Sequence, residues 1–123
     1  MTRRLMVVDD EWAYRITLQE IFIQEGWEVI SAEHGPGAIQ IASESRIDLI
    51  FMDMHVKSMS GIDTCSAIKE ILPDCVIVMV TGYCDYALVQ QPLSQGAMTV
   101  MAKPVSTEQL FEISNQVDYA SPS

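Results

Sequence analysis

An apolar run that ends at a single acid is the feature that most constrains the fold. Residues 49–52 read Leu-Ile-Phe-Met without polar alternation, and Asp53 follows them directly. Such a run is typical of a strand buried on both faces of a parallel sheet, and these sheets carry their ligands at the carboxyl ends of the strands. The sequence therefore predicts that Asp53 lies at a ligand-binding edge. The alternative is an aspartate that only ends a strand and begins a turn.

Short apolar runs recur along the chain and alternate with segments of helical periodicity. The predicted strands cover residues 5–8, 27–31, 47–52, 75–80 and 98–102. A helix is predicted after each strand, which makes five βα units and a parallel sheet with helices on both faces. Because crossover connections of this kind are right-handed, the pattern favours an α/β fold with a doubly wound five-stranded parallel sheet.

Capping and turn signals set the limits of the first two helices. In the first, Trp12, Ile16 and Ile23 recur at helical spacing through about residue 25, and Gly26 is placed as the C-cap glycine. Residues 34–37, His-Gly-Pro-Gly, are predicted to form a turn before the second helix, which ends near Ser45.

The later helices carry clearer signals, with one exception. The third helix opens at Gly61, and the last begins at a capping box formed by Ser106 and Gln109. The helix expected from about Asp85 contains Pro92, which removes a hydrogen bond and clashes with the preceding turn. The buried face of the last helix is predicted from three apolar residues, Leu110, Ile113 and Val117.

Length and composition exclude several classes of protein. A chain of 123 residues is expected to form one domain over residues 1–119, with 120–123 as a tail or the start of a linker. A net charge of -10 argues against binding nucleic acid or an anionic membrane surface directly. Three cysteines without metal-ligand spacing suggest reduced thiols, and the apolar run 5–8 is too short for a signal peptide or membrane span, so a cytoplasmic protein is expected.

Polar residues at the ends of four predicted strands form a constellation. The carboxyl ends of parallel strands lie on one edge, and here they carry Asp9 with Asp10, Asp53, Thr81 and Lys103. Three carboxylates in close quarters repel one another unless a cation neutralises them, and Mg²⁺ prefers oxygen ligands. A threonine hydroxyl and a lysine can stabilise the charge on an incoming phosphoryl group. The pattern predicts a phosphoryl-transfer site with Asp53 as the nucleophile.

Each member of the constellation also has a simpler explanation. Asp9 and Asp10 could cap the first helix, Thr81 could be an ordinary strand residue, and Lys103 could be a solvated surface lysine. These explanations leave open why all of them stand at the ends of strands one, three, four and five.

The motifs in this order resemble the receiver domain of two-component response regulators, over essentially the whole chain. The matching pieces are residues 7–11, residues 49–53, Gly61, residues 78–82, Gly96-Ala97 and Lys103-Pro104. The resemblance implies a flavodoxin-like fold with the strand order 2-1-3-4-5. It also implies a regulatory module and not an enzyme, one that catalyses only its own phosphoryl transfer and dephosphorylation.

The resemblance also implies roles for individual residues. Asp53 would be the phospho-acceptor; Asp9, Asp10, Asp53 and the backbone carbonyl of His55 would hold Mg²⁺. Thr81 would be the switch hydroxyl, and Lys103 would pair with the acceptor or the phosphoryl group, next to a cis peptide bond before Pro104.

The same resemblance implies the partners. The phosphoryl group would come from a sensor histidine kinase or a histidine phosphotransfer protein, and phosphorylation would switch the interactions of the domain with other proteins. A homodimer could form through the face made by the fourth helix, the fifth strand and the fifth helix.

Three positions depart from the pattern of the family. Lys57 stands where a proline is usual, Gly82 where an alanine is usual, and Val100 where the family has its switch aromatic. Since Val100 has no ring to move, signalling by the usual aromatic rotamer is in doubt.

Two other functions compete with phospho-acceptance. An interaction module that works without phosphorylation would not need all of the residues that stand at the strand ends. A hydrolase of the haloacid dehalogenase type would need an acid two residues after its nucleophile, where this chain has His55.

Overall fold

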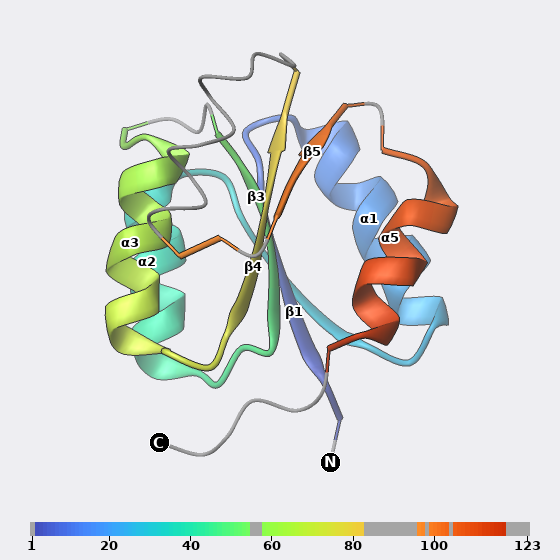
Figure 1. Ribbon diagram of the computed structural model, residues 1–123, viewed down its shortest axis with the longest axis horizontal. Helices are drawn as coiled ribbons and strands as arrows, with labels where there is room; N and C mark the ends of the chain where they lie inside the picture. Colours follow the sequence, from blue (N-terminus) through green and yellow to red (C-terminus); the bar gives the residue numbers. More distant parts are fainter. Residues whose placement is uncertain (1, 55–57, 83–95, 98, 104, 118–123) are drawn as a thin grey trace.

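The sheet has the predicted order of strands. The computed structural model describes residues 2–54, 58–82, 96–97, 99–103 and 105–117. Its five parallel strands are arranged in the order β2-β1-β3-β4-β5 (Figure 1). The strands are β1 Arg4–Val8, β2 Glu28–Ala32, β3 Leu49–Asp53, β4 Val76–Thr81 and β5 Thr99–Ala102. The order 2-1-3-4-5 is confirmed.

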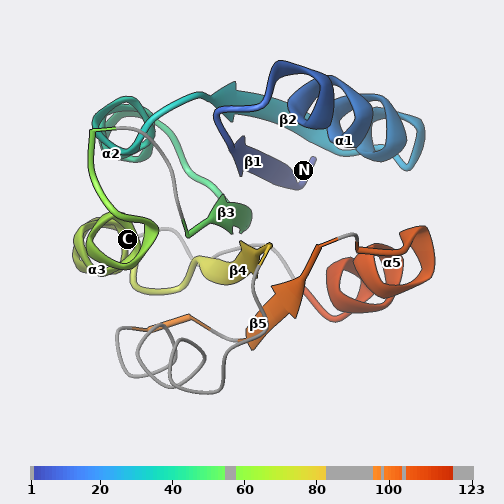
Figure 2. The same cartoon turned by 90° about the horizontal axis from the view of Figure 1, so that it is seen from above.

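Helices cover both faces of this sheet, as a doubly wound fold requires. They are α1 Trp12–Gln24, α2 Gly35–Glu44, α3 Gly61–Ile71 and α5 Thr107–Asn115. Helices α2 and α3 lie on one face and α1 and α5 on the other (Figures 1 and 2). The helix expected from about residue 85 through Pro92 lies outside the described residues. Within the described part of the chain, no helix is long and apolar enough to cross a membrane.

Alternate residues of the central strands feed two separate cores. In β1, Leu5 and Val7 belong to the core under α1 and α5, whereas Met6 and Val8 belong to the core under α2 and α3. All four side chains are fully buried. Successive side chains of a strand point to opposite faces, so the middle of a strand that is covered on both sides favours apolar residues at every position. This explains the uninterrupted apolar runs.

The strand limits differ from the predicted ones by one or two residues. Strand β3 begins at Leu49 instead of Ile47 and includes Asp53. Ile47 and Asp48 precede it and are both buried. The Asp48 carboxylate is accommodated because Arg46 Nη1 and the Arg4 backbone amide each donate to it at 2.7 Å.

Helix α1 is confirmed, but its buried face is not the one on which Trp12 and Ile23 lie. The side chains of Trp12 and Ile23 are 67% and 58% exposed, and Leu18 and Phe22 are buried in their place. The Phe22 ring stacks on the ring of Phe51, with 5.5 Å between centroids. A contact between α1 and β3 therefore sets the rotation of the helix about its axis. Aromatic burial of this kind contributes more to stability than the apolar side chains that remain exposed.

The predicted turn at residues 34–37 is wrong. Residues 35–37 form the first turn of α2, and His34 is its N-cap, with Nδ1 accepting a hydrogen bond from the Gly37 amide at 2.9 Å. Pro36 is tolerated there because the first amides of a helix need no partner within the helix.

Other terminal signals are confirmed. Gly26 follows α1 with φ of +89°, a left-handed conformation that favours glycine. Ser106 and Gln109 form the capping box of α5, and Leu110, Ile113 and Val117 are buried.

Gly61 brings α3 against the end of β3. Its amide donates to the Met54 carbonyl at 3.0 Å. A Cβ at position 61 would collide with the Asp53 carbonyl oxygen and would lie 2.7 Å from Met54 Cα. Both neighbours are backbone atoms, so a side chain at this position could be accommodated only by moving the main chain.

We expect Gly61→Ala to lower the free energy of unfolding by about 2 kcal/mol, because the added methyl group forces α3 and β3 apart. The matched control is Gly82→Ala, since no atom of the described residues lies within 4 Å of a Cβ built there. It should stay within about 0.5 kcal/mol of the parent protein. Urea denaturation of the three proteins gives the comparison, and equal stability of the two variants would contradict it.

Candidate functional site

Asp9, Asp53, Thr81 and Lys103 lie at the carboxyl ends of the strands, and this edge of the sheet is uppermost in Figure 1. Asp53 is the last residue of β3 and Thr81 the last residue of β4. Asp9 directly follows β1, and Lys103 directly follows β5. The Lys103 amide donates to the Thr81 carbonyl at 2.7 Å, which ties the end of β5 to the end of β4. The parallel arrangement therefore brings residues from four strands together, as the sequence predicted.

Three carboxylates gather at this edge. Asp9, Asp10 and Asp53 each offer a carboxylate oxygen, and these oxygens lie within 4.8 Å of one another. Asp9 is 1% and Asp53 7% exposed, so solvent screens their repulsion poorly. Two ligands on opposite sides of Mg²⁺ lie about 4.2 Å apart. The donor type and the spacing both suit one hard divalent cation.

Among the described residues, Lys103 is the cation that pairs with the carboxylates of this cluster. Its Nζ lies 2.7 Å from Asp9 Oδ2, 3.8 Å from Asp53 Oδ2 and 3.8 Å from Glu11 Oε1. Burial lowers the pKa of Lys103, but the hydrogen bond with Asp9 and the negative charges of Asp53 and Asp9 outweigh burial and raise it above its ordinary value. The ammonium is therefore held charged, with Asp9 as its nearest partner.

Asp9 serves the backbone as well as the cluster. Its Oδ1 accepts a hydrogen bond from the Glu11 amide at 2.9 Å, and its own carbonyl accepts one from Arg15 Nη1 at 2.6 Å. The capping explanation for Asp9 is thus partly right, although the helix begins only at Trp12. One carboxylate oxygen shapes the turn after β1, and the other faces Lys103.

Tyr14 is a neighbour of the site that the sequence analysis missed. Lys103 Nζ lies 4.4 Å from the centroid of its ring, within the range of a cation–π interaction. Its hydroxyl oxygen is buried, and no described residue forms a hydrogen bond with it. Burial, the largest influence, raises the pKa of Tyr14 to about 12. The signal was the spacing of Tyr14, Leu18 and Phe22, four residues apart, which marks the true inner face of α1.

Two further residues singled out in the sequence, Thr81 and Val100, lie in β4 and β5. Thr81 is buried and pairs in register with Ala102 of β5. Val100, which stands at the position of the switch aromatic, is half-buried, pairs with Met79 and packs against the core under α2 and α3. His55, Lys57 and Pro104 lie outside the described residues.

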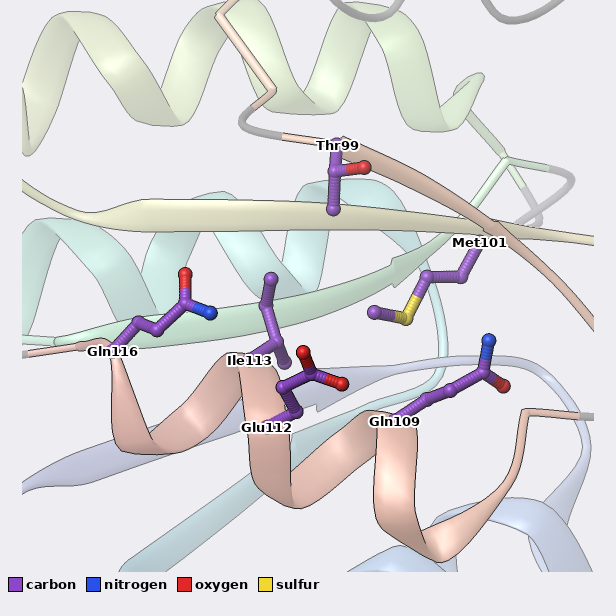
Figure 3. Close-up of a pocket in the computed structure, with 6 residues that line it drawn as sticks. All are labelled: Thr99, Met101, Gln109, Glu112, Ile113 and Gln116. Atoms are coloured by element: carbon purple, nitrogen blue, oxygen red, sulfur yellow. The ribbon is translucent and has the colours of Figure 1, made fainter.

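Apart from the acid cluster, the surface has a hollow between β5 and α5. Figure 3 shows its lining, which comes from both elements: Thr99, Met101, Gln109, Glu112, Ile113 and Gln116. None of these residues belongs to the acid cluster. Its lining has four polar residues and two apolar ones, and its one carboxylate is that of Glu112.

Comparison with known proteins identifies the family. The model of the response regulator receiver domain matches residues 5–115. The chain is 31% identical over 110 residues to sporulation initiation phosphotransferase F of Bacillus subtilis, and the match covers 89% of each protein.

Solved structures agree with this assignment. One is a response regulator protein from Burkholderia pseudomallei with a phosphorylated aspartic acid, calcium ion and citrate. It has a TM-score of 0.85 at 27% identity, over 89% of this chain and 64% of that one. Another is the CheX-CheY-BeF3-Mg²⁺ complex from Borrelia burgdorferi, with a TM-score of 0.81 at 26% identity, over 89% of this chain and 84% of that one. The chain belongs to the response regulator receiver domain family and is a phospho-accepting receiver domain of the two-component type.

Proposed function

We propose that Asp53 is the phospho-acceptor of this receiver domain and that Mg²⁺ is its cofactor. The observation that carries the proposal is the gathering of the Asp9, Asp10 and Asp53 carboxylates within 4.8 Å beside the Lys103 ammonium. If these strand ends had only a structural role, repulsion among the gathered carboxylates would not stabilise the fold. Two solved relatives support the assignment, since one contains a phosphorylated aspartic acid and a calcium ion and the other contains BeF3 with Mg²⁺.

Each residue of the cluster has a distinct part in the transfer. An Asp53 carboxylate oxygen forms the new bond to phosphorus while the bond to the donor's imidazole nitrogen breaks, and the electron pair of that bond returns to the imidazole. Asp9 and Asp10, with Asp53 and the carbonyl of His55, would hold Mg²⁺, which when bound neutralises charge on the phosphoryl oxygens. Lys103 approaches the same oxygens from the side of β5.

Thr81 completes the set of donors. It is buried at the end of β4, next to the strand that carries Asp53. A hydroxyl at this position can donate a hydrogen bond to a phosphoryl oxygen without adding charge to the site. The domain catalyses its own phosphorylation and the later hydrolysis of the aspartyl phosphate. Phosphorylation changes the surface that the domain presents to a partner protein.

The partners follow from this chemistry. The phosphoryl donor is a phosphohistidine of a sensor histidine kinase or a phosphotransfer protein, and we infer a cytoplasmic location from this pairing. With a net charge of -10, the domain itself is not suited to bind nucleic acid. The receiver extends over residues 1–119, and its face at β5 and α5, which includes the hollow in Figure 3, can serve a homodimer. No observation favours a module that works without phosphorylation.

We expect Asp53→Asn to abolish labelling by a small phosphodonor in the presence of Mg²⁺, because the amide lacks the nucleophilic oxygen. The matched control is Asp74→Asn, an exposed carboxylate that precedes β4 at the opposite edge of the sheet. It should be labelled like the parent protein, and labelling requires Mg²⁺ in both. Mass spectrometry of the intact proteins measures the result, and equal labelling of Asp53→Asn would remove Asp53 from this role.

Asp10→Asn should raise the melting temperature of the metal-free protein by about 3 °C, since it relieves roughly 0.5–1 kcal/mol of repulsion. The same change should weaken Mg²⁺ binding by about tenfold or more, equivalent to about 1.4 kcal/mol. Calorimetric melting with and without Mg²⁺ tests both parts, with Asp74→Asn as the control that should show neither effect. A lower melting temperature with unchanged affinity would mean that Asp10 only supports the turn before α1.

A further inference from the structure

The ammonium of Lys103 has two kinds of neighbour. Asp9 Oδ2 lies 2.7 Å and Asp53 Oδ2 3.8 Å away. Nζ also lies over the Tyr14 ring, 4.4 Å from the ring centroid. An aromatic face attracts a cation through its quadrupole and carries no net charge. The ring therefore holds the ammonium independently of what the carboxylates bind.

The position of this ring is fixed by the core. Tyr14 packs against the core under α1 and α5, on the same face of α1 as Leu18 and Phe22. Both of these are buried, and Phe22 stacks on Phe51 of β3. A side chain anchored in this way has few alternative rotamers, so the ring is a rigid surface for a flexible lysine.

The hydroxyl of Tyr14 does not explain its presence. The oxygen is buried and has no hydrogen-bond partner among the residues that the structure describes. With its pKa raised to about 12, chiefly by burial, the phenol remains neutral at any physiological pH. The part of Tyr14 that contacts the site is the face of its ring.

We propose that Tyr14 is a positioning residue. Its ring keeps the Lys103 ammonium at the acid cluster when Asp9 binds a metal ion. This inference rests on the proposed function, because only then does Asp9 give up its short contact with Lys103. A lysine side chain released from that contact has four torsions in which to move toward solvent. The ring limits this movement and leaves the ammonium within reach of Asp53 and its phosphoryl group.

The test compares a variant that keeps the ring with variants that lose it. The measured quantity is the dissociation constant of beryllium fluoride in saturating Mg²⁺, followed by fluorine NMR. Tyr14→Leu should weaken binding by about fivefold, the loss expected for one partly buried cation–π contact. Tyr14→Phe should restore the affinity to within about twofold. Tyr14→Met serves as a second ringless variant if the leucine variant unfolds.

Two controls separate positioning from a general disturbance of α1. In a Lys103→Gln background, Tyr14→Leu should cause no further loss, because the ring then has no ammonium to hold. Trp12→Leu removes an exposed ring from the same helix and should leave the affinity of the parent protein unchanged. Equal losses from Tyr14→Leu with and without Lys103, no loss at all, or a loss in Tyr14→Phe as large as that in Tyr14→Leu would each overturn the proposal.

The Asp53→Asn variant keeps this failure distinct from failure of the proposed function. If Asp53→Asn abolishes beryllium fluoride binding and Tyr14→Leu binds like the parent protein, only the role of Tyr14 falls. If Asp53→Asn binds as well as the parent protein, both assignments fall together.

Discussion

The ion pair between Lys103 and Asp9 compensates a repulsion that the topology makes unavoidable. Parallel strands end at one edge, so acids at the ends of β1 and β3 must meet there, and burial prevents water from screening them. Lys103 reaches the cluster from the end of β5, which is separated from β1 by two other strands. The register of the whole sheet is therefore needed to bring the ammonium within 2.7 Å of Asp9.

The five strands and their parallel arrangement could be predicted from local patterns, whereas their order, 2-1-3-4-5, was implied by the resemblance to the receiver family. Uninterrupted apolar runs mark strands covered on both faces, and the order of acids, hydroxyl and lysine along the chain places them at one edge. The buried face of α1 could not be predicted in this way, since the helix has apolar residues on more than one side. The choice is made by Phe22 stacking on Phe51, a contact between residues far apart in sequence.

The candidate site shows the same division. Asp9, Asp10, Asp53 and Lys103 come together as their positions at the strand ends predict. The preference of Lys103 for Asp9 over Asp53, and its contact with Tyr14, depend on how side chains from α1 and β5 pack. The N-cap role of His34 was hidden because the glycines and the proline that follow it are equally common in turns.

The contact of Gly61 with the backbone of Asp53 and Met54 has a consequence for how this domain can diverge. Where two elements touch through side chains, substitution can change their spacing by small steps, but main chain in contact with main chain has one closest approach. Met52, Met54 and Met79 are buried in the core under α2 and α3, where exchanges that conserve volume are the ones tolerated best. The acid cluster thus has a fixed reference point, and variation in its behaviour must come from the side chains around it.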